Sequence, residues 1–364
     1  MQTYGQEGAL NTDTELSHVL HDSKHQAAFY VEENKPQDLL RSFISETGLS
    51  EEEAVEVLKA VKGGGGGGSG DFSASLTALE LLQKEEELRS IVTFSSQLDE
   101  SLGGGIPVGK ITEVCGVPGI GKTQLCLQLA VDVQVPQCFG GVEGQVMFID
   151  TEGSFLLQRV TDIAAAAVRH CSLLAEDDEQ RAATETFTVE TVLSNIFLVR
   201  CHDHVELLAE LHLLPDFLSQ HPKIRLLVID SVAFPFRLLF DELSQRTRLL
   251  NGVGQQLITM AINYNISVVI TNQMTTRIRD GQSHIVPALG ECWGHAPTIR
   301  LLLQWEGSRR LATIFKSPCH METMVQYQIT PEGFRDADQS EMPQSKQPRM
   351  DTDQSAADPK ETSS

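Results

Sequence analysis

An eight-residue run, GVPGIGKT at positions 116–123, constrains this chain more than any other feature of its sequence. It matches the P-loop pattern G-x-x-x-x-G-K-[ST] at every fixed position, between a strand-like run at 111–115 and a helix-like stretch at 124–135. In such a loop the backbone N–H groups face phosphate oxygens, and the N-terminus of the next helix adds partial positive charge. The motif therefore predicts nucleotide binding.

Each fixed residue of the motif has a physical role in this prediction. Glycine tolerates the backbone angles of the curl, Lys122 can reach the outer phosphates, and the Thr123 hydroxyl can bind Mg²⁺. We expect the nucleotide to be held by Gly116, Val117, Pro118, Gly119, Ile120, Gly121, Lys122, Thr123 and Gln124. The alternative, a glycine-rich turn with a chance lysine, is disfavoured by the complete match and its flanking pattern.

Composition narrows the class of protein. The chain has 364 residues, 41% hydrophobic and 21% charged, as expected for one large globular domain with a smaller one. We expect no membrane span and no signal peptide. Seven scattered cysteines without a C-x-x-C pair suit a reducing compartment, with buried thiols. The net charge of −22 argues against strong autonomous binding of nucleic acid, although a local loop can be basic.

Changes in composition divide the chain into four parts. Residues 1–62 contain two short helical patterns and predict a small helical domain whose start is poorly ordered. The run GGGGGGSG lies in a predicted flexible linker, 63–75. Residues 76–336 form the predicted main domain, and the polar residues 337–364 a disordered tail.

Within the main domain, apolar strand runs alternate with amphipathic helices, which predicts an α/β fold with a mainly parallel sheet. The predicted strands cover 111–115, 145–150, 195–200, 226–230 and 267–272. Three later runs follow one another without helices, and we expect them to add antiparallel strands at one edge: 298–304, 311–315 and 324–329.

Two acids follow apolar strands. Asp230 ends the strand at 226–230 in a Walker B pattern, which places a carboxylate beside the Mg²⁺ shell of a P-loop protein. Glu152 lies just beyond the strand at 145–150, at the sheet edge where α/β folds bind ligands. Two interpretations of Glu152 stay open here: it orients and polarises the water that attacks the γ-phosphate, or it caps the next helix.

A polar amide and two loops complete the candidate site. Gln273 follows the strand at 267–272 and can either sense the γ-phosphate or make only loop hydrogen bonds. The segment at 274–297 is long for a loop in a compact domain, so it is functional or disordered. The loop at 233–237 offers aromatic residues and Arg237 to nucleic acid, but the interpretation of its aromatics as core residues is slightly favoured.

Taken together and in order, these segments resemble the eukaryotic branch of the RecA-type recombinase family, over roughly 76–334. The resemblance lies in SQLDESLGGGIPVGKITEVCGVPGIGKTQLCLQLAVDVQ, VMFIDTEGSF, LLVIDS, VVITNQ and KSP, and details such as PALGECWGHAPTIRL are most similar to its mediator paralogues. It implies a RecA-like core that binds and hydrolyses ATP with Mg²⁺, stimulated by DNA. It also implies hetero-oligomers with other recombinase paralogues, action with the main RecA-type recombinase on single-stranded and branched DNA, and a nuclear, also cytoplasmic, location.

The resemblance assigns roles to individual residues. At the nucleotide, it implies that Lys122 and Thr123 bind phosphate and Mg²⁺, and that Asp230 is the Walker B acid. It implies that Glu152 polarises the attacking water and that Gln273 links the γ-phosphate to the second DNA loop. It also implies that Arg159 packs on adenine. It places Arg237 in the first DNA loop and Arg277 and Arg279 in the second. His295 matches a residue that senses nucleotide across a subunit interface, and Lys316, Ser317 and Pro318 match a cap on a neighbour's nucleotide.

Two departures from the family pattern bear on function. The aromatic residue of the polymerisation element is replaced by Ser75, which argues against assembly of this chain with itself. Lys316 stands where strand-exchange recombinases tend to carry an acid, and its ammonium is a candidate positive charge beside a neighbour's phosphates. The leading hypothesis is a paralogue subunit whose ATP site serves assembly in recombination; the alternatives are an autonomous filament-forming strand-exchange recombinase and a scaffold with structural ATP.

Overall fold

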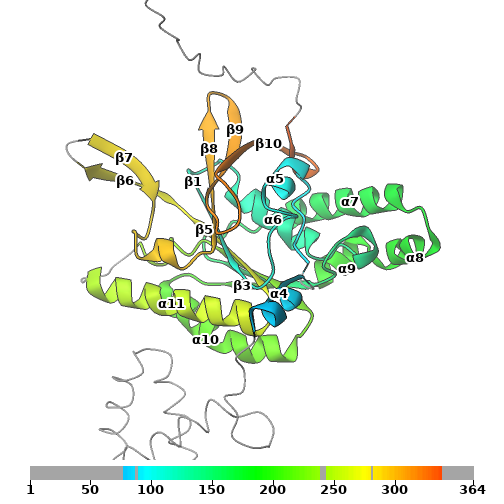
Figure 1. Ribbon diagram of the computed structural model, residues 1–364, viewed down its shortest axis with the longest axis horizontal. Helices are drawn as coiled ribbons and strands as arrows, with labels where there is room; N and C mark the ends of the chain where they lie inside the picture. The colour runs from blue at the N-terminus through cyan, green and yellow to red at the C-terminus, as the bar shows by residue number, and fades with distance from the viewer. Residues whose placement is uncertain (1–76, 87–88, 238–242, 280–281, 338–364) are drawn as a thin grey trace, which may run out of the picture.

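A nine-stranded sheet is the framework of the main domain, with strand order β11-β10-β9-β8-β1-β5-β4-β2-β3 (Figure 1). The computed structural model describes residues 77–86, 89–237, 243–279 and 282–337. The predicted helical domain, the linker and all of the predicted tail except Ala337 lie outside the described residues. The α/β class, with a mainly parallel sheet and antiparallel edge strands, is confirmed.

Five of the six strands in the parallel part of the sheet come before the long connection at 273–298. They are β1 (Ile111–Gly116), β2 (Gln145–Asp150), β3 (Ile196–Arg200), β4 (Ile224–Asp230) and β5 (Ser267–Asn272). Neighbouring members pair in parallel, so their carboxyl ends meet at one edge of the sheet. Each predicted strand is confirmed to within two residues, because continuous apolar runs are typical of strands buried on both faces.

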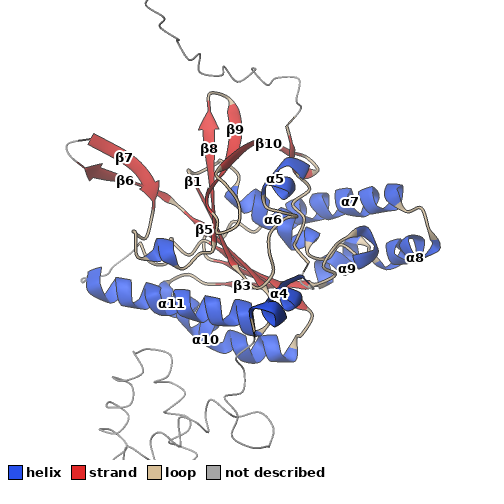
Figure 2. Ribbon diagram, in the orientation of Figure 1, coloured by secondary structure: helices blue, strands red, loops and turns tan. Residues whose placement is uncertain are grey.

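Helices cover both faces of this parallel part (Figure 2). One face packs against α6 (Lys122–Asp132), α7 (Leu157–Leu174) and α9 (Val189–Ser194), and the other against α10 (His204–Gln220) and α11 (Leu243–Asn263). Alternate side chains of each strand reach opposite faces, as β-strand geometry requires. Val146 and Phe148 of β2 join the first cluster, whereas Met147 and Ile149 join the second.

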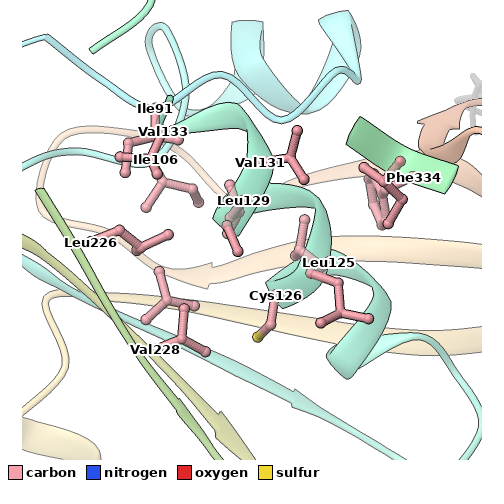
Figure 3. Packing of buried hydrophobic residues seen from close by; sticks show 14 of the residues in the cluster. Ile91, Ile106, Leu125, Cys126, Leu129, Val131, Val133, Leu226, Val228 and Phe334 are labelled. Atoms are coloured by element: carbon pink, nitrogen blue, oxygen red, sulfur yellow. The ribbon is translucent and has the colours of Figure 1, made fainter. Parts of the chain in front are cut away.

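The helix that follows the P-loop is anchored by this packing. Leu125, Cys126 and Leu129 of α6 lie in the same buried cluster as Leu226 and Val228 of β4 (Figure 3). All five are 0% exposed, so α6 is held rigidly against the strand that ends in Asp230. Core contacts of this kind fix the relative positions of the two phosphate-site elements.

The remaining helical elements are short or peripheral. They are α4 (Ala78–Glu86), α5 (Ser96–Ser101), α8 (Asp178–Thr186) and the 3₁₀ turns η1 (Gln137–Phe139) and η2 (Trp293–His295). Among the described helices, none has the length and apolarity needed to cross a membrane. Four of the seven cysteines are buried, but Cys138 is partly buried and Cys292 and Cys319 are exposed, so the expectation of buried thiols holds only in part.

The other four strands extend the sheet beyond β1. They are β8 (Ile299–Glu306), β9 (Arg309–Lys316), β10 (Thr323–Thr330) and β11 (Gly333–Asp336). The prediction that all the late strands are antiparallel is wrong for β8, which pairs in parallel with β1; the antiparallel pairs begin with β9. The long connection at 273–298 returns the chain to the amino end of β1, so β8 runs in the same direction.

That long connection is itself partly regular. Strands β6 (Met274–Arg279) and β7 (Gln282–Pro287) pair as an antiparallel hairpin that projects from the body of the domain (Figure 1). The prediction of a loop, functional or disordered, over 274–297 is wrong for the hairpin, which is regular. Its strands are short and pack on no buried core, so they lack the apolar run by which strands are recognised.

The end of the main domain is fastened to its beginning. The Asp336 carboxylate, at the end of β11, accepts hydrogen bonds from Ser95 Oγ at 2.5 Å, from Ser96 N at 2.9 Å and Oγ at 2.5 Å, and from Gln97 N at 3.3 Å. These donors lie at the N-terminus of α5, where a carboxylate is favoured. Burial opposes ionisation of Asp336, but these hydrogen bonds outweigh it and lower its pKa.

We predict that Asp336→Ala lowers the free energy of unfolding by about 1–2 kcal/mol in urea denaturation at neutral pH. Because the folded-state pKa lies below the ordinary value, the contribution of Asp336 is present above about pH 4 and is lost as the pH falls further. Glu322→Ala, at an exposed position before β10, should change stability by less than about 0.5 kcal/mol. Equal losses in the two variants would contradict the docking role.

Candidate nucleotide-binding site

The P-loop connects the end of β1 to the start of α6, as its motif predicts. Gly119 and Gly121 have φ values of 76° and 119°, a region that side chains with a Cβ rarely adopt. A Cβ on Gly116 would lie 2.8 Å from Ile120 Cγ2 and 2.8 Å from the carbonyl oxygen of Leu303. Two of the glycines are therefore required for backbone conformation and the third for space.

Strand β10 braces this loop from the side. The Tyr327 hydroxyl donates to the Ile120 carbonyl at 2.9 Å, and the Tyr327 side chain is 2% exposed. A Cβ on Gly121 would lie 3.2 Å from Ile329 Cδ1. Burial raises the pKa of Tyr327, so its hydroxyl keeps the proton that it donates. Tyr327 is not among the predicted site residues, because nothing in the P-loop pattern points to a position 207 residues away.

Lys122 lies over its own loop. Its Nζ donates to the carbonyls of Gly116 at 2.9 Å and Val117 at 3.3 Å. Burial lowers the pKa of the Lys122 ammonium, and the nearby carboxylates of Asp230 and Glu152 partly counteract that effect. The cation is thus held at the loop that is predicted to cradle phosphate.

The Walker B acid and the P-loop threonine are in direct contact. Thr123 Oγ1 donates to Asp230 Oδ2 at 2.6 Å, and Asp230 also accepts from Thr271 Oγ1 at 2.5 Å and Ser154 Oγ at 3.2 Å. Asp230 is 2% exposed; burial raises its pKa, whereas the three hydrogen bonds favour its charged form. A hydroxyl and a carboxylate side by side are the hard oxygen ligands that Mg²⁺ prefers, so this pair fits the metal.

Glu152 lies beside this pair and does not cap a helix. Its Oε1 accepts from Ser231 Oγ at 2.5 Å and from Gln273 Nε2 at 2.7 Å. The N-cap of α7 is Leu156, which makes no side-chain capping bond. The capping interpretation of Glu152 is therefore wrong, and Gln273 is tied to the site by a direct hydrogen bond.

The loop after β4 reaches the same amide. The Arg237 guanidinium donates to Gln273 Oε1, so one amide bridges Arg237 and Glu152. Arg237 is exposed, whereas Phe236 is 1% exposed and packs in the second core cluster. The interpretation of the loop's aromatics as core residues holds for Phe236, and Arg237 remains accessible.

Arg159 joins three elements beside the first turn of the P-loop helix. Its guanidinium donates to Gln124 Oε1 at 2.6 Å, to the Thr330 carbonyl at 2.7 Å and to the Pro331 carbonyl at 2.5 Å. Gln124 belongs to α6 and Arg159 to α7; the Thr330 carbonyl ends β10, and the Pro331 carbonyl lies in the turn that follows it. These partners hold the guanidinium beside the P-loop helix, and its role at adenine stays a prediction.

The predicted residues of the second DNA loop and of the interface lie on other elements than this cluster. Arg277, on β6, pairs with Glu291 at 2.6 Å, and Arg279 is the last residue of the same strand. His295 ends the turn η2, and Lys316 ends β9, two residues before Pro318. Lys316 donates to carbonyls of the segment that contains His295. Their functions stay predictions.

This sheet order, with a P-loop after β1 and an acid at the end of β4, defines a P-loop protein with a RecA-like core. The chain belongs to the Rad51 family, whose model, described as Rad51, matches residues 84–337. The family resemblance found in the motifs is thereby confirmed.

Two relatives show how far the similarity extends. The chain is similar to the "DNA repair protein RAD51 homolog 3" of Cricetulus griseus, with 53% identity over 312 residues, 83% of this chain and 84% of that protein. It is also similar to the protein of the same name in Dictyostelium discoideum, with 40% identity over 264 residues, 72% of this chain and 69% of that protein. Both matches cover more than the P-loop and its flanks.

We predict that Tyr327→Phe lowers the free energy of unfolding by about 1–3 kcal/mol, because the buried Ile120 carbonyl loses its donor. Tyr264→Phe is the matched control, since the Tyr264 hydroxyl makes only a 3.4 Å contact with Ser219 Oγ at an exposed site. Urea denaturation should show a change below about 0.5 kcal/mol for the control. A Tyr327 variant as stable as the control would rule out the brace.

Proposed function

We propose that this protein is an ATP-binding and ATP-hydrolysing subunit of hetero-oligomeric complexes that act in recombinational DNA repair. The observation on which this rests is the arrangement at the sheet edge: Thr123 on Asp230, with Glu152 held beside them by Ser231 and Gln273. A protein that used ATP only as a structural ligand has no need of a second carboxylate held in this position.

The chain's own residues supply the parts of a phosphoryl-transfer site. Thr123 and Asp230 hold Mg²⁺, which neutralises phosphate charge when it is bound. Lys122 binds the outer phosphates in place of its loop carbonyls. Both hydrogen bonds to Glu152 reach Oε1, so Oε2 is available to orient and deprotonate a water molecule.

The role in recombination rests on the relatives and on the sequence. The similar proteins are named for DNA repair, and the family is that of Rad51. Ser75, at the aromatic position of the polymerisation element, favours assembly with other paralogues over assembly with itself. The net charge of −22 argues against strong autonomous binding of DNA. In this proposal the complexes load the main recombinase on single-stranded and branched DNA. The protein is located in the nucleus, and also in the cytoplasm.

The second candidate is an autonomous, filament-forming strand-exchange recombinase. The accessible Arg237 and the projecting hairpin with Arg277 favour it, since both offer basic groups to a DNA strand. Electron microscopy of the purified chain with ATP, Mg²⁺ and single-stranded DNA separates the two. Discrete particles support the paralogue subunit; continuous filaments would establish the recombinase.

Glu152→Gln should reduce ATP turnover by at least about 10²-fold and leave ATP binding intact, because the amide cannot take a proton from water. Turnover is measured on the purified complex, and binding with a fluorescent ATP analogue. Glu190→Gln, at an exposed position of α9, is the control and should retain full turnover. Unchanged turnover in Glu152→Gln would sink the hydrolytic role.

Lys122→Ala should weaken ATP binding by about tenfold or more, because a charge-assisted contact to phosphate is lost. If ATP stabilises the joint with a neighbouring subunit, the variant also retains less of a co-expressed paralogue in a pull-down with ATP. Lys223→Ala, at an exposed position, is the control. If the variant binds ATP more weakly but retains as much of the paralogue as the wild type does, assembly does not depend on the bound nucleotide.

A further inference from the structure

The turn η2 is fastened to the strand that leads into the P-loop. Trp293 Nε1 donates to Glu113 Oε1 at 2.7 Å, and Glu113, in the middle of β1, is 0% exposed. The same oxygen accepts from Asn272 Nδ2 at 2.8 Å, at the end of β5. One buried carboxylate therefore fixes this side of the turn to the sheet.

The opposite side of the turn is held by Lys316. Its Nζ donates to three main-chain carbonyls, of Gly294 at 2.9 Å, His295 at 3.2 Å and Pro297 at 2.6 Å. An ammonium has three N–H groups. All three are therefore used within the segment 294–297 of its own chain.

A bulge in the sheet places the two cations of this region. Arg300 of β8 pairs with Lys316, but Leu301 pairs with Ile314, so β9 has one extra residue, Phe315. Such a bulge bends the strand and redirects its side chains. The Arg300 guanidinium lies 4.8 Å from the centre of the Phe315 ring.

Arg300 also supports the turn from beneath. Its Nε donates to Glu113 Oε2 at 2.5 Å. A Cβ on Gly294 would lie only 2.9 Å from Arg300 Nη1, so the backbone of the turn rests on the guanidinium. The carboxylate of Glu113 is thus satisfied by groups from three elements, and Lys316 is left to bond the carbonyls.

We propose that Lys316 is a positioning residue: its ammonium clamps the segment 294–297, and with it His295, against the end of β9. Its charge is committed to these carbonyls and not to the phosphates of a neighbouring subunit. The clamp rests on contacts within one chain. Only its consequence for nucleotide sensing by His295 rests on the proposed function.

The test is hydrogen exchange of the full-length protein carrying Lys316→Met, which keeps the length of the side chain and removes its donors. Two main-chain hydrogen bonds close the turn. His295 N donates to the Cys292 carbonyl at 3.3 Å, and Ala296 N donates to the Trp293 carbonyl at 3.0 Å. These amides should exchange at least about tenfold faster in the variant. Peptides from β1 and β5 should be unchanged, and they report any global loss of structure. Lys223→Met, at an exposed position, is the control.

Lys316→Arg separates the clamp from a role of the charge alone. A planar guanidinium cannot donate to three converging carbonyls from one nitrogen, so this variant should also exchange faster although it keeps its charge. If the turn exchanges at the wild-type rate in both variants, the proposal is overturned. A fall of partner-dependent ATP affinity only in Lys316→Met would then assign the role to the charge. If exchange rises while that affinity is unchanged, the clamp is supported and the interface role of His295 fails.

Discussion

The carboxylate of Asp230 is the contact on which the geometry of the site depends. A charge buried to this extent is tolerated only when its oxygens are satisfied, and each donor to Asp230 comes from a different part of the chain. Thr123 belongs to α6, Ser154 to the segment after β2, and Thr271 to β5. The parallel strands must therefore end at the same level for these contacts to form, which explains why the P-loop, Glu152 and Gln273 meet at one edge.

Sequence reasoning succeeded where local pattern and physical role coincide. The P-loop, the apolar strand that ends in Asp230 and the acid at position 152 are contiguous signals, and the structure brings Glu152 and Gln273 into hydrogen-bond contact. It could not exclude capping by Glu152, because the partners of its carboxylate, Ser231 and Gln273, lie far along the chain. It failed for the direction of β8, since parallel and antiparallel strands have the same apolar pattern at an edge.

The contacts that sequence reasoning missed share a physical cause. The hydroxyl of Tyr327 on the P-loop, the carbonyls that hold Arg159 and those that hold Lys316 all involve main-chain atoms. Every residue has a main-chain carbonyl, so the residue type does not indicate which carbonyl accepts a hydrogen bond, and no sequence motif predicts it. From the sequence, Lys316 at the end of β9 is therefore interpreted as a free positive charge, whereas its three carbonyl acceptors are seen only in the folded structure.

The hydrogen bond from Tyr327 to the P-loop also determines when the loop can gain its support during synthesis on the ribosome. The loop is complete as a sequence once Thr123 has been made, but the tyrosine that supports it follows 207 residues after Ile120. At ~5–20 residues per second, the ribosome needs roughly 10–40 s to cover that distance. Throughout this interval the nascent chain has the phosphate-binding motif without its lateral support. A firmly seated nucleotide site is thus among the last properties that the growing domain acquires.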